Sequence, residues 1–157
     1  MKKDVELRAL RYSLTLLRYR ARSEREIKER LTNKKFPVKI VQQVMRILRK
    51  QGYIDDKKFA QLFLSDYISR GFGQIRVYEK LKQLGVSKKI ITCTLVDKSE
   101  FDIKLSEIIE SRLYADKNKR AVFKLVLHLK RKGFYLVDIY KQLSSMGVDI
   151  DEDIGVT

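Results

Sequence analysis

The stretch RGFGQIRVYEKLKQLGVSKKII, residues 70–91, has two relatives within the same chain. They are RARSEREIKERLTNKKFPVKIV (residues 20–41) and KGFYLVDIYKQLSSMGVDIDED (residues 132–153). Each stretch carries two apolar residues four positions apart, a spacing that predicts a buried helix stripe: Ile27 and Leu31, Val77 and Leu81, Ile139 and Leu143. Self-similarity of this kind predicts a tandem helical repeat.

The repeat also predicts where its helices begin and end. A basic residue (Arg20, Arg70 or Lys132) and a small one (Ala21, Gly71 or Gly133) lead to a helix start at Ser23, Gly73 or Tyr135. Ser23 and Glu26 match the S-x-x-E capping box, a specific sequence signal for the helix start at Ser23. A turn is expected at Lys35, Gly85 and Gly147, and a third helix then starts at Pro37, Ser87 and Asp149.

A longer helix precedes each stretch. Its apolar stripe is expected at Leu7, Leu10, Leu14 and Leu17 in the first repeat, at Phe59, Ala60, Phe63 and Tyr67 in the second, and at Val122, Leu125 and Leu129 in the third. Phe101, Leu105, Ile108 and Ile109 predict a further, linking helix. We therefore predict an all-α protein of three tandem three-helix repeats, stacked in an elongated, curved array. The expected boundaries are 1–54, 55–98, a linking helix at 99–116, and 117–157 with an acidic tail.

The aspartate pair in GYIDDKKFA, residues 52–60, is interpreted as a helix start. Ile54 and Phe59 have the spacing of a hydrophobic staple around an Asp55 N-cap, and Asp56 then lies in the first turn, near the positive end of the helix dipole. An acid/base pair is disfavoured, because adjacent helical residues point about 100° apart.

Composition limits the function classes. Thirty-five basic against twenty acidic residues give a net charge of +15, which favours a polyanionic or strongly acidic partner. Cys93 is expected to be a small core residue, and with His128 as the single histidine a zinc site is disfavoured. There is no apolar run long enough to span a membrane and no signal peptide pattern, so we expect a cytoplasmic protein.

No motif for catalysis or cofactor binding is found, and we expect neither an enzyme nor a cofactor. Gly71 and Gly73 could offer backbone N–H groups to a phosphate, but a C-cap and an N-cap across a tight turn explain them more simply. The recurring cations Arg20, Arg70 and Lys132 suit either a periodic array of anions or the C-terminal carbonyls of the preceding helix. The residues leave both interpretations open.

With the repeat established, residues 7–148 resemble the RecX family of bacterial RecA regulators. Four segments carry the resemblance: LLRYRARSEREIKERL (16–31), GYIDDKKFA (52–60), SRGFGQIRVYEKLKQLGV (69–86) and RKGF (131–134). The chain departs from the family at Tyr135, where a small capping residue is usual. The resemblance assigns motif positions to Ser23, Glu26, Gly52, Tyr53, Asp55, Asp56, Phe59, Gly85, Gly133 and Phe134.

The resemblance implies a monomer that lies in the groove of the RecA–DNA filament and blocks its extension. RecA's ATPase, strand-exchange and co-protease activities would fall as a consequence, and weak binding to single- or double-stranded DNA is also implied. The candidate RecA- or DNA-binding residues are Arg18, Arg20, Arg22, Arg25, Lys28, Arg70, Arg76, Lys80, Arg131 and Lys132.

Two rival functions remain. In the first, each repeat acts like a helix-turn-helix on DNA, with Gln42, Gln43, Arg46 and Arg49 reading bases. The equivalent helix of the second repeat offers little beyond Thr92 and Thr94, which weighs against this hypothesis. In the second, the chain is a structural adaptor for an acidic partner.

Overall fold

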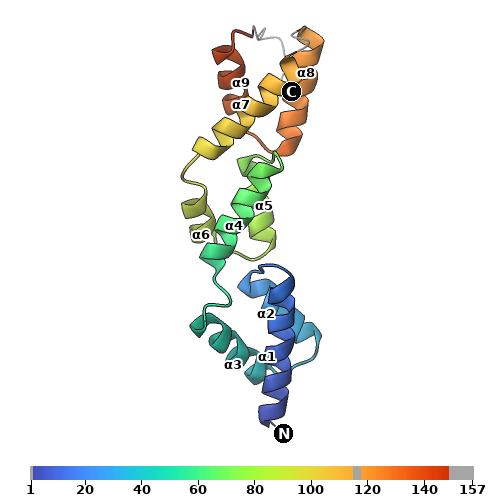
Figure 1. Cartoon of the computed structure of the whole chain (residues 1–157), viewed down its shortest axis with the longest axis vertical. Coiled ribbons are helices and arrows are strands. Elements are labelled where there is room, and N and C mark those ends of the chain that lie inside the picture. Colours follow the sequence, from blue (N-terminus) through green and yellow to red (C-terminus); the bar gives the residue numbers. More distant parts are fainter. Residues whose placement is uncertain (1, 115–117, 149–157) are drawn as a thin grey trace. The chain divides into compact units, whose positions relative to one another are not determined.

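The computed structural model describes residues 2–114 and 118–148, and within these ranges it holds nine α-helices and no strand (Figure 1). In chain order the helices are α1 (Lys2–Tyr19), α2 (Glu24–Asn33), α3 (Val38–Lys50), α4 (Asp56–Ser69), α5 (Gln74–Gln83), α6 (Lys88–Thr94), α7 (Ser99–Leu113), α8 (Lys119–Lys132) and α9 (Leu136–Ser145). The all-α prediction is confirmed. The helix start expected at Asp149 and the acidic tail lie outside the described residues.

The repeat register located the helix starts correctly. α2, α5 and α9 begin one residue after Ser23, Gly73 and Tyr135. Ser23 caps α2 in a complete capping box, as predicted, whereas the Tyr135 side chain forms no capping hydrogen bond. The Gly85, Gly147 and Lys35 turns all have positive φ, between 60° and 82°. Lys35 therefore holds a left-handed conformation that costs a non-glycine residue about 1 kcal/mol.

Six helix ends in the described chain close in the same way. At each one, the residue after a positive-φ residue donates its backbone N–H to the carbonyl five positions back, as Phe72 does to Tyr67 at 3.0 Å and Phe134 to Leu129 at 3.2 Å. This is the Schellman motif, and the donating residue is apolar or aromatic every time: Phe36, Tyr53, Phe72, Val86, Phe134 and Val148. The repeated turn chemistry in the sequence is thus a repeated way to end a helix.

The chain divides into two compact units. Unit 1 comprises Met1–Leu62 and Leu81–Thr94, and unit 2 comprises Phe63–Lys80 and Leu95–Thr157. The division passes through α4 and α5, so the second predicted repeat contributes residues to both units. The predicted repeat boundaries stay predictions.

In unit 1, α1 packs against α2 and α3, and α2 packs against α3 (Figure 1). The core is made mostly by α2 and α3, which bury Ile27, Leu31, Ile40, Val41, Val44, Met45 and Leu48. From α1 the fully buried residues are the small Ala9 and Ser13, and the Ser13 hydroxyl donates to the Ala9 carbonyl at 2.9 Å. Small residues on this face let α1 approach its neighbours closely.

In unit 2, α7, α8 and α9 pack against one another (Figure 1). α7 buries Phe101, Leu105, Ile109 and Leu113, and α8 buries Val122, Leu125, Val126 and Leu129. The buried stripes expected for these two helices are confirmed, apart from Ile108, which is half-buried. The α7 helix is therefore a full partner in this three-helix packing.

Two predictions about burial are wrong. Leu7 is 46% exposed, because it lies about 200° around α1 from the buried Ala9. Cys93 is exposed rather than buried, because α6 is only seven residues long and buries Ile91, two positions away and on its opposite face. An apolar neighbourhood in sequence did not specify which side of either helix faces the core.

Candidate binding surfaces

The start of α2 is a hydrogen-bonded assembly centred on Ser23. Its hydroxyl accepts from the Glu26 backbone N–H, and Glu26 Oε2 accepts from the Ser23 backbone N–H, both at 3.2 Å. The same hydroxyl donates to the carbonyl of Leu84, just past the end of α5, at 2.5 Å. Ser23 is fully buried. It therefore both caps α2 and joins it to Leu84, a residue of unit 1.

Arg20 and Arg22 lie on either side of the Glu26 carboxylate. Arg20 pairs with Glu26 at 2.5 Å, and Arg22 pairs with it at 3.5 Å while donating to the Leu16 carbonyl at 3.3 Å. Burial opposes ionisation of Glu26, but the hydrogen bonds from Arg20 and Ser23 outweigh it and lower the pKa of the carboxyl. The Arg22 side chain is only 11% exposed, and burial followed by the charge of Arg20 lowers its pKa. Arg22 thus contacts a carbonyl near the end of α1, whereas Arg20, one of the three cations for which such a contact was an interpretation, donates to the Ala21 carbonyl and to Glu26.

The other candidate cations of unit 1 face solvent. Arg18 lies over the ring of Tyr19, and Lys28 is exposed on α2. Arg25 pairs with Glu29 at 2.7 Å, and its alkyl chain lies against Gly85 so closely that a Cβ there would come within 2.1 Å of Arg25 Cδ. Glycine at position 85 therefore makes room for an arginine stem as well as a left-handed turn.

The aspartate pair has two different roles. Asp55 caps α4, its Oδ1 accepting from the backbone N–H groups of Lys57 at 2.9 Å and Lys58 at 3.2 Å, so the capping prediction is confirmed. Asp56 instead accepts from the Glu24 backbone N–H at 2.8 Å, which satisfies an open donor in the first turn of α2. Burial raises the pKa of Asp56, and the Glu24 hydrogen bond offsets this only in part.

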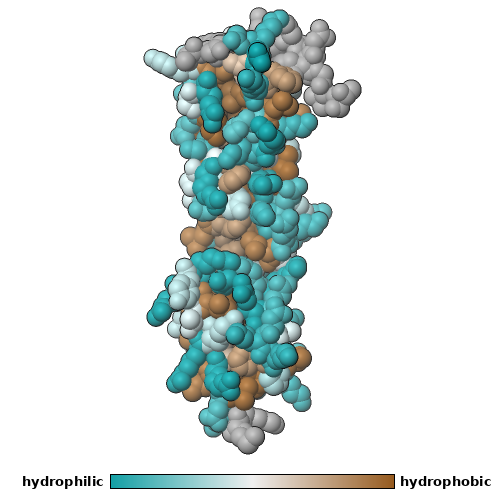
Figure 2. All heavy atoms as spheres, turned by 90° about the vertical axis from the view of Figure 1, so that its right-hand side faces the viewer, coloured by the Kyte–Doolittle hydropathy of each residue, from teal (hydrophilic) through white to brown (hydrophobic). Residues whose placement is uncertain are grey.

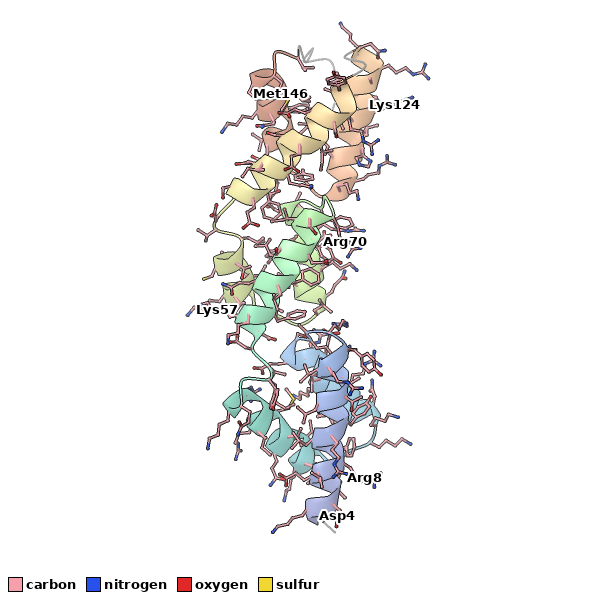
Figure 3. The ribbon with its side chains drawn as sticks, viewed as in Figure 1. Asp4, Arg8, Lys57, Arg70, Lys124 and Met146 are labelled. Atoms are coloured by element: carbon pink, nitrogen blue, oxygen red, sulfur yellow. The ribbon has the colours of Figure 1, made fainter. Side chains whose placement is uncertain are left out.

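Unit 2 holds a group of rings and cations, here called the aromatic–cation cluster, formed by Phe63, Tyr67, Arg70, Phe72 and Lys132. Phe63 and Tyr67 stack with their ring centroids 4.1 Å apart, and Tyr67 meets Phe72 at 5.0 Å. Arg70, labelled in Figure 3 at the end of α4, lies over both Tyr67 and Phe72, and Lys132 lies 4.3 Å from the Phe72 ring centroid. Two repeat-equivalent cations thus share one aromatic ring.

The end of α8 meets the start of α5 within unit 2. The Gly73 N–H donates to the Lys132 carbonyl at 2.9 Å, and the Ile75 N–H donates to the Gly133 carbonyl at 3.0 Å. Gly71 has φ 74° and ends α4. The capping interpretation of the two glycines is therefore confirmed, and the Gly73 N–H that a phosphate would need is already engaged.

The remaining candidates of unit 2 are Arg76, Lys80 and Arg131. Arg76 is exposed and its backbone lies against Gly133, Lys80 is half-buried, and Arg131 is exposed beside a groove between α7 and α8. Five of the ten candidate cations therefore belong to each unit. Figure 2 shows a face on which hydrophilic residues cover most of the surface between smaller hydrophobic patches.

Within the described ranges no group of three or more His, Cys, Asp or Glu side chains could hold a metal ion. Likewise, none of the helices in residues 2–114 and 118–148 is long and apolar enough to cross a membrane. Helical repeats with cations on both units define an all-α repeat protein whose surface suits an anionic partner.

Comparison with known proteins specifies this class. A family model described as the first three-helix domain of RecX matches residues 9–46. The regulatory protein RecX of Finegoldia magna is 31% identical over 142 residues, which cover 85% of this chain and 69% of the relative. That of Halorhodospira halophila is 24% identical, with coverage of 91% and 89%. The chain belongs to the RecX family of regulatory proteins.

Solved structures share the fold. The crystal structure of RecX from Lactobacillus salivarius matches with a TM-score of 0.79 at 18% identity, over 94% of this chain and 99% of that one. A second crystal structure, of a regulatory protein RecX, matches with a TM-score of 0.74 at 21% identity, over 91% and 73%. Some relatives are longer, since this chain covers 58% of the regulatory protein RecX from Oceanobacillus iheyensis.

Proposed function

We propose that this protein regulates RecA by binding in the groove of the RecA–DNA filament and inhibiting filament extension. Loss of RecA's ATPase, recombinase and co-protease activities follows from the shorter filaments. Membership of the RecX family supports the regulatory role, and the resemblance of the repeat motifs to that family supplies RecA as the partner. The protein is proposed to act as a monomer without a cofactor.

The observation that carries the proposal is the presence of exposed, uncommitted cations in both units. Arg18 and Lys28 of unit 1, and Arg76 and Arg131 of unit 2, form no ion pair with any carboxylate of the described chain. Their charge is therefore available to a partner, whereas Arg20, Arg22, Arg25 and Arg70 each have an acidic neighbour. A filament that repeats along its axis offers acidic groups and phosphates to both units at once.

The test is RecA's hydrolysis of ATP on single-stranded DNA, with the protein added in substoichiometric amount after the filaments have formed. We expect a progressive fall in the rate, because capping a growing end affects many RecA subunits. Two double variants, Arg18→Glu with Lys28→Glu and Arg76→Glu with Arg131→Glu, should each weaken this effect. Lys50→Glu with Lys89→Glu removes the same charge from exposed positions outside the candidate set and should leave it intact.

A rate that stays constant at substoichiometric protein would contradict filament capping. Equal losses in the candidate and control variants would show that only net charge matters. Circular dichroism of every variant separates these outcomes from loss of the helical fold.

A second candidate function is DNA binding, and the aromatic–cation cluster favours it. Rings beside cations are the combination with which proteins hold single strands, the rings stacking on bases and the cations contacting phosphates. The hypothesis of helix-turn-helix binding to DNA has less support, because Arg49, one of its base-reading residues, forms an ion pair with Glu24 at 2.6 Å. Salt-sensitive binding to single-stranded DNA without any effect on RecA would favour this second function.

A further inference from the structure

A groove between α7 and α8 of unit 2 is lined by cations that form no ion pair within the described chain. Its volume is about 410 Å³, and it is lined by Arg112, Leu113, Ala121, Lys124, Leu125, Leu127, His128 and Arg131. Three of the lining residues are permanent cations and none is acidic. No described carboxylate forms an ion pair with Arg112, Lys124 or Arg131.

The cations are arranged along one side of the groove. Lys124 and Arg131 are seven positions apart on α8, about 10 Å along the helix, with His128 between them, and Arg112 lines the groove from α7. Figure 3 shows Lys124 on α8. Burial, then the charges of Arg112, Lys132 and Arg131, lower the pKa of His128, which places these cations within electrostatic reach of the imidazole.

The rest of the lining decides between classes of anion. No Phe, Tyr or Trp lines the groove, so the imidazole of His128 is the one lining ring on which a base could stack, whereas the aromatic–cation cluster offers three rings. Leucines line it instead: Leu113 and Leu125 are buried beneath it, whereas Leu127 is 42% exposed. Apolar lining beside a row of cations matches an amphipathic segment that carries carboxylates next to its apolar side chains.

We propose that the α7–α8 groove binds an acidic amphipathic segment of a partner protein. The segment's carboxylates pair with Arg112, Lys124 and Arg131, and its apolar side chains pack on the exposed Leu127. The aromatic–cation cluster, which has rings, remains the place for nucleic acid. The two surfaces thus differ in the chemistry that they recognise, although both belong to unit 2.

The experiment uses the full chain and a labelled amphipathic peptide with glutamate along one face and leucine along the other. Fluorescence anisotropy should show binding that weakens about tenfold for Lys124→Glu and for Arg131→Glu, since each reverses a charge that the carboxylates meet. Lys130→Glu is the matched control: it lies on the same helix, is exposed and does not line the groove, so it should bind within about twofold of the unaltered chain.

His128 supplies a site-specific readout, because it is the single histidine of the sequence. Its imidazole resonance should shift when the peptide is added, and its pKa should rise, because nearby carboxylates favour the imidazolium form. A Lys130→Glu chain should show the same rise, and an Arg131→Glu chain should need more peptide to reach it.

Three results would overturn the proposal. One is equal binding of a peptide in which glutamine replaces every glutamate, which would reduce the groove to an apolar contact. Another is equal weakening by Lys130→Glu and Arg131→Glu, which would show diffuse charge attraction. The third is binding of an oligothymidylate, but not of the peptide, with a shift of the His128 resonance, which would make the groove a nucleic-acid site.

Discussion

At the scale of single residues, the two adjacent aspartates show how far sequence reasoning reaches. The partners of Asp55 are backbone groups two and three positions away, so its capping role could be predicted from the local pattern. The partner of Asp56 is the Glu24 N–H, 32 positions away, and no local pattern specifies such a contact. Arg22 is similar, because its place in sequence suggests a binding cation, and no local pattern indicates that its side chain is 11% exposed and donates to the Leu16 carbonyl.

Asp56 provides a test of this long-range contact. Asp56→Ala should lower the free energy of unfolding by about 1 kcal/mol, because it leaves a backbone donor of α2 without its partner. Asp56→Asn should cost much less at neutral pH, since its carbonyl oxygen can still accept from Glu24. Urea unfolding of the three proteins measures the difference. An equal loss in both variants would mean that the charge, rather than the hydrogen bond, matters.

The raised pKa of Asp56 predicts the pH dependence. The folded chain holds this proton at pH values where the unfolded chain has released it, so the contribution of Asp56 to stability is larger at low pH and declines as pH rises through the folded pKa. The unfolding free energy of the unaltered chain, relative to Asp56→Asn, should therefore increase as pH falls from 7 toward about 4. A relative stability that decreased over this range would contradict the assigned direction.

At the scale of helices, the sequence predicted the first residues of the helices, but it did not predict which distant residues the helix ends contact. The i, i+4 stripes and the turn residues located the starts of α2, α5 and α9 because these signals are local. The contact between the end of α8 and the start of α5 joins residues about 60 positions apart, and Gly133 gives no sign in the sequence that it faces Arg76.

Alanine substitution at two glycines can distinguish the cost of backbone strain in a turn from the cost of disturbing the contact between α8 and α5. Gly147 has φ 68°, and an added Cβ would meet no atom within 4 Å, so Gly147→Ala should cost about 1 kcal/mol of stability from backbone strain alone. Gly133 has φ 89°, and a Cβ there would lie 2.7 Å from the Arg76 backbone nitrogen. Gly133→Ala should therefore cost clearly more in a denaturant titration. Equal costs would show that α5 and α8 can separate slightly without penalty.

At the scale of the whole molecule, a net charge of +15 predicts salt-sensitive association with nucleic acid. For single-stranded DNA, the slope of log K against log salt should become less steep by about 0.7 in Arg70→Gln, because one phosphate contact of the aromatic–cation cluster is lost. Lys50→Gln, an exposed position outside the cluster, should leave the slope unchanged. Fluorescence anisotropy over a range of salt concentrations measures both slopes, and an unchanged slope for Arg70→Gln would place the phosphate contacts elsewhere.

Fold class and family could both be predicted from the sequence. A repeat shows the same helix signals several times, so a weak signal in one repeat is compensated by clear signals at the equivalent positions of the others. The division into two units could not, since it passes through α4 and α5, whose helical patterns are continuous. Of the cations that line the α7–α8 groove, the sequence indicates only Arg131, because Arg112 comes from a helix whose pattern predicts no more than a linker.

The six Schellman ends bear on how the chain is made. Each is closed by an N–H that lies five residues after the carbonyl it meets, so a helix end is complete as soon as that short stretch has left the ribosome. A nascent chain can therefore form these closing contacts in the order of synthesis, whereas helices this short still need packing partners to become stable. Local contacts of this kind also favour rapid folding. Packing of the helices, rather than closure of their ends, is then the step that waits for later parts of the chain.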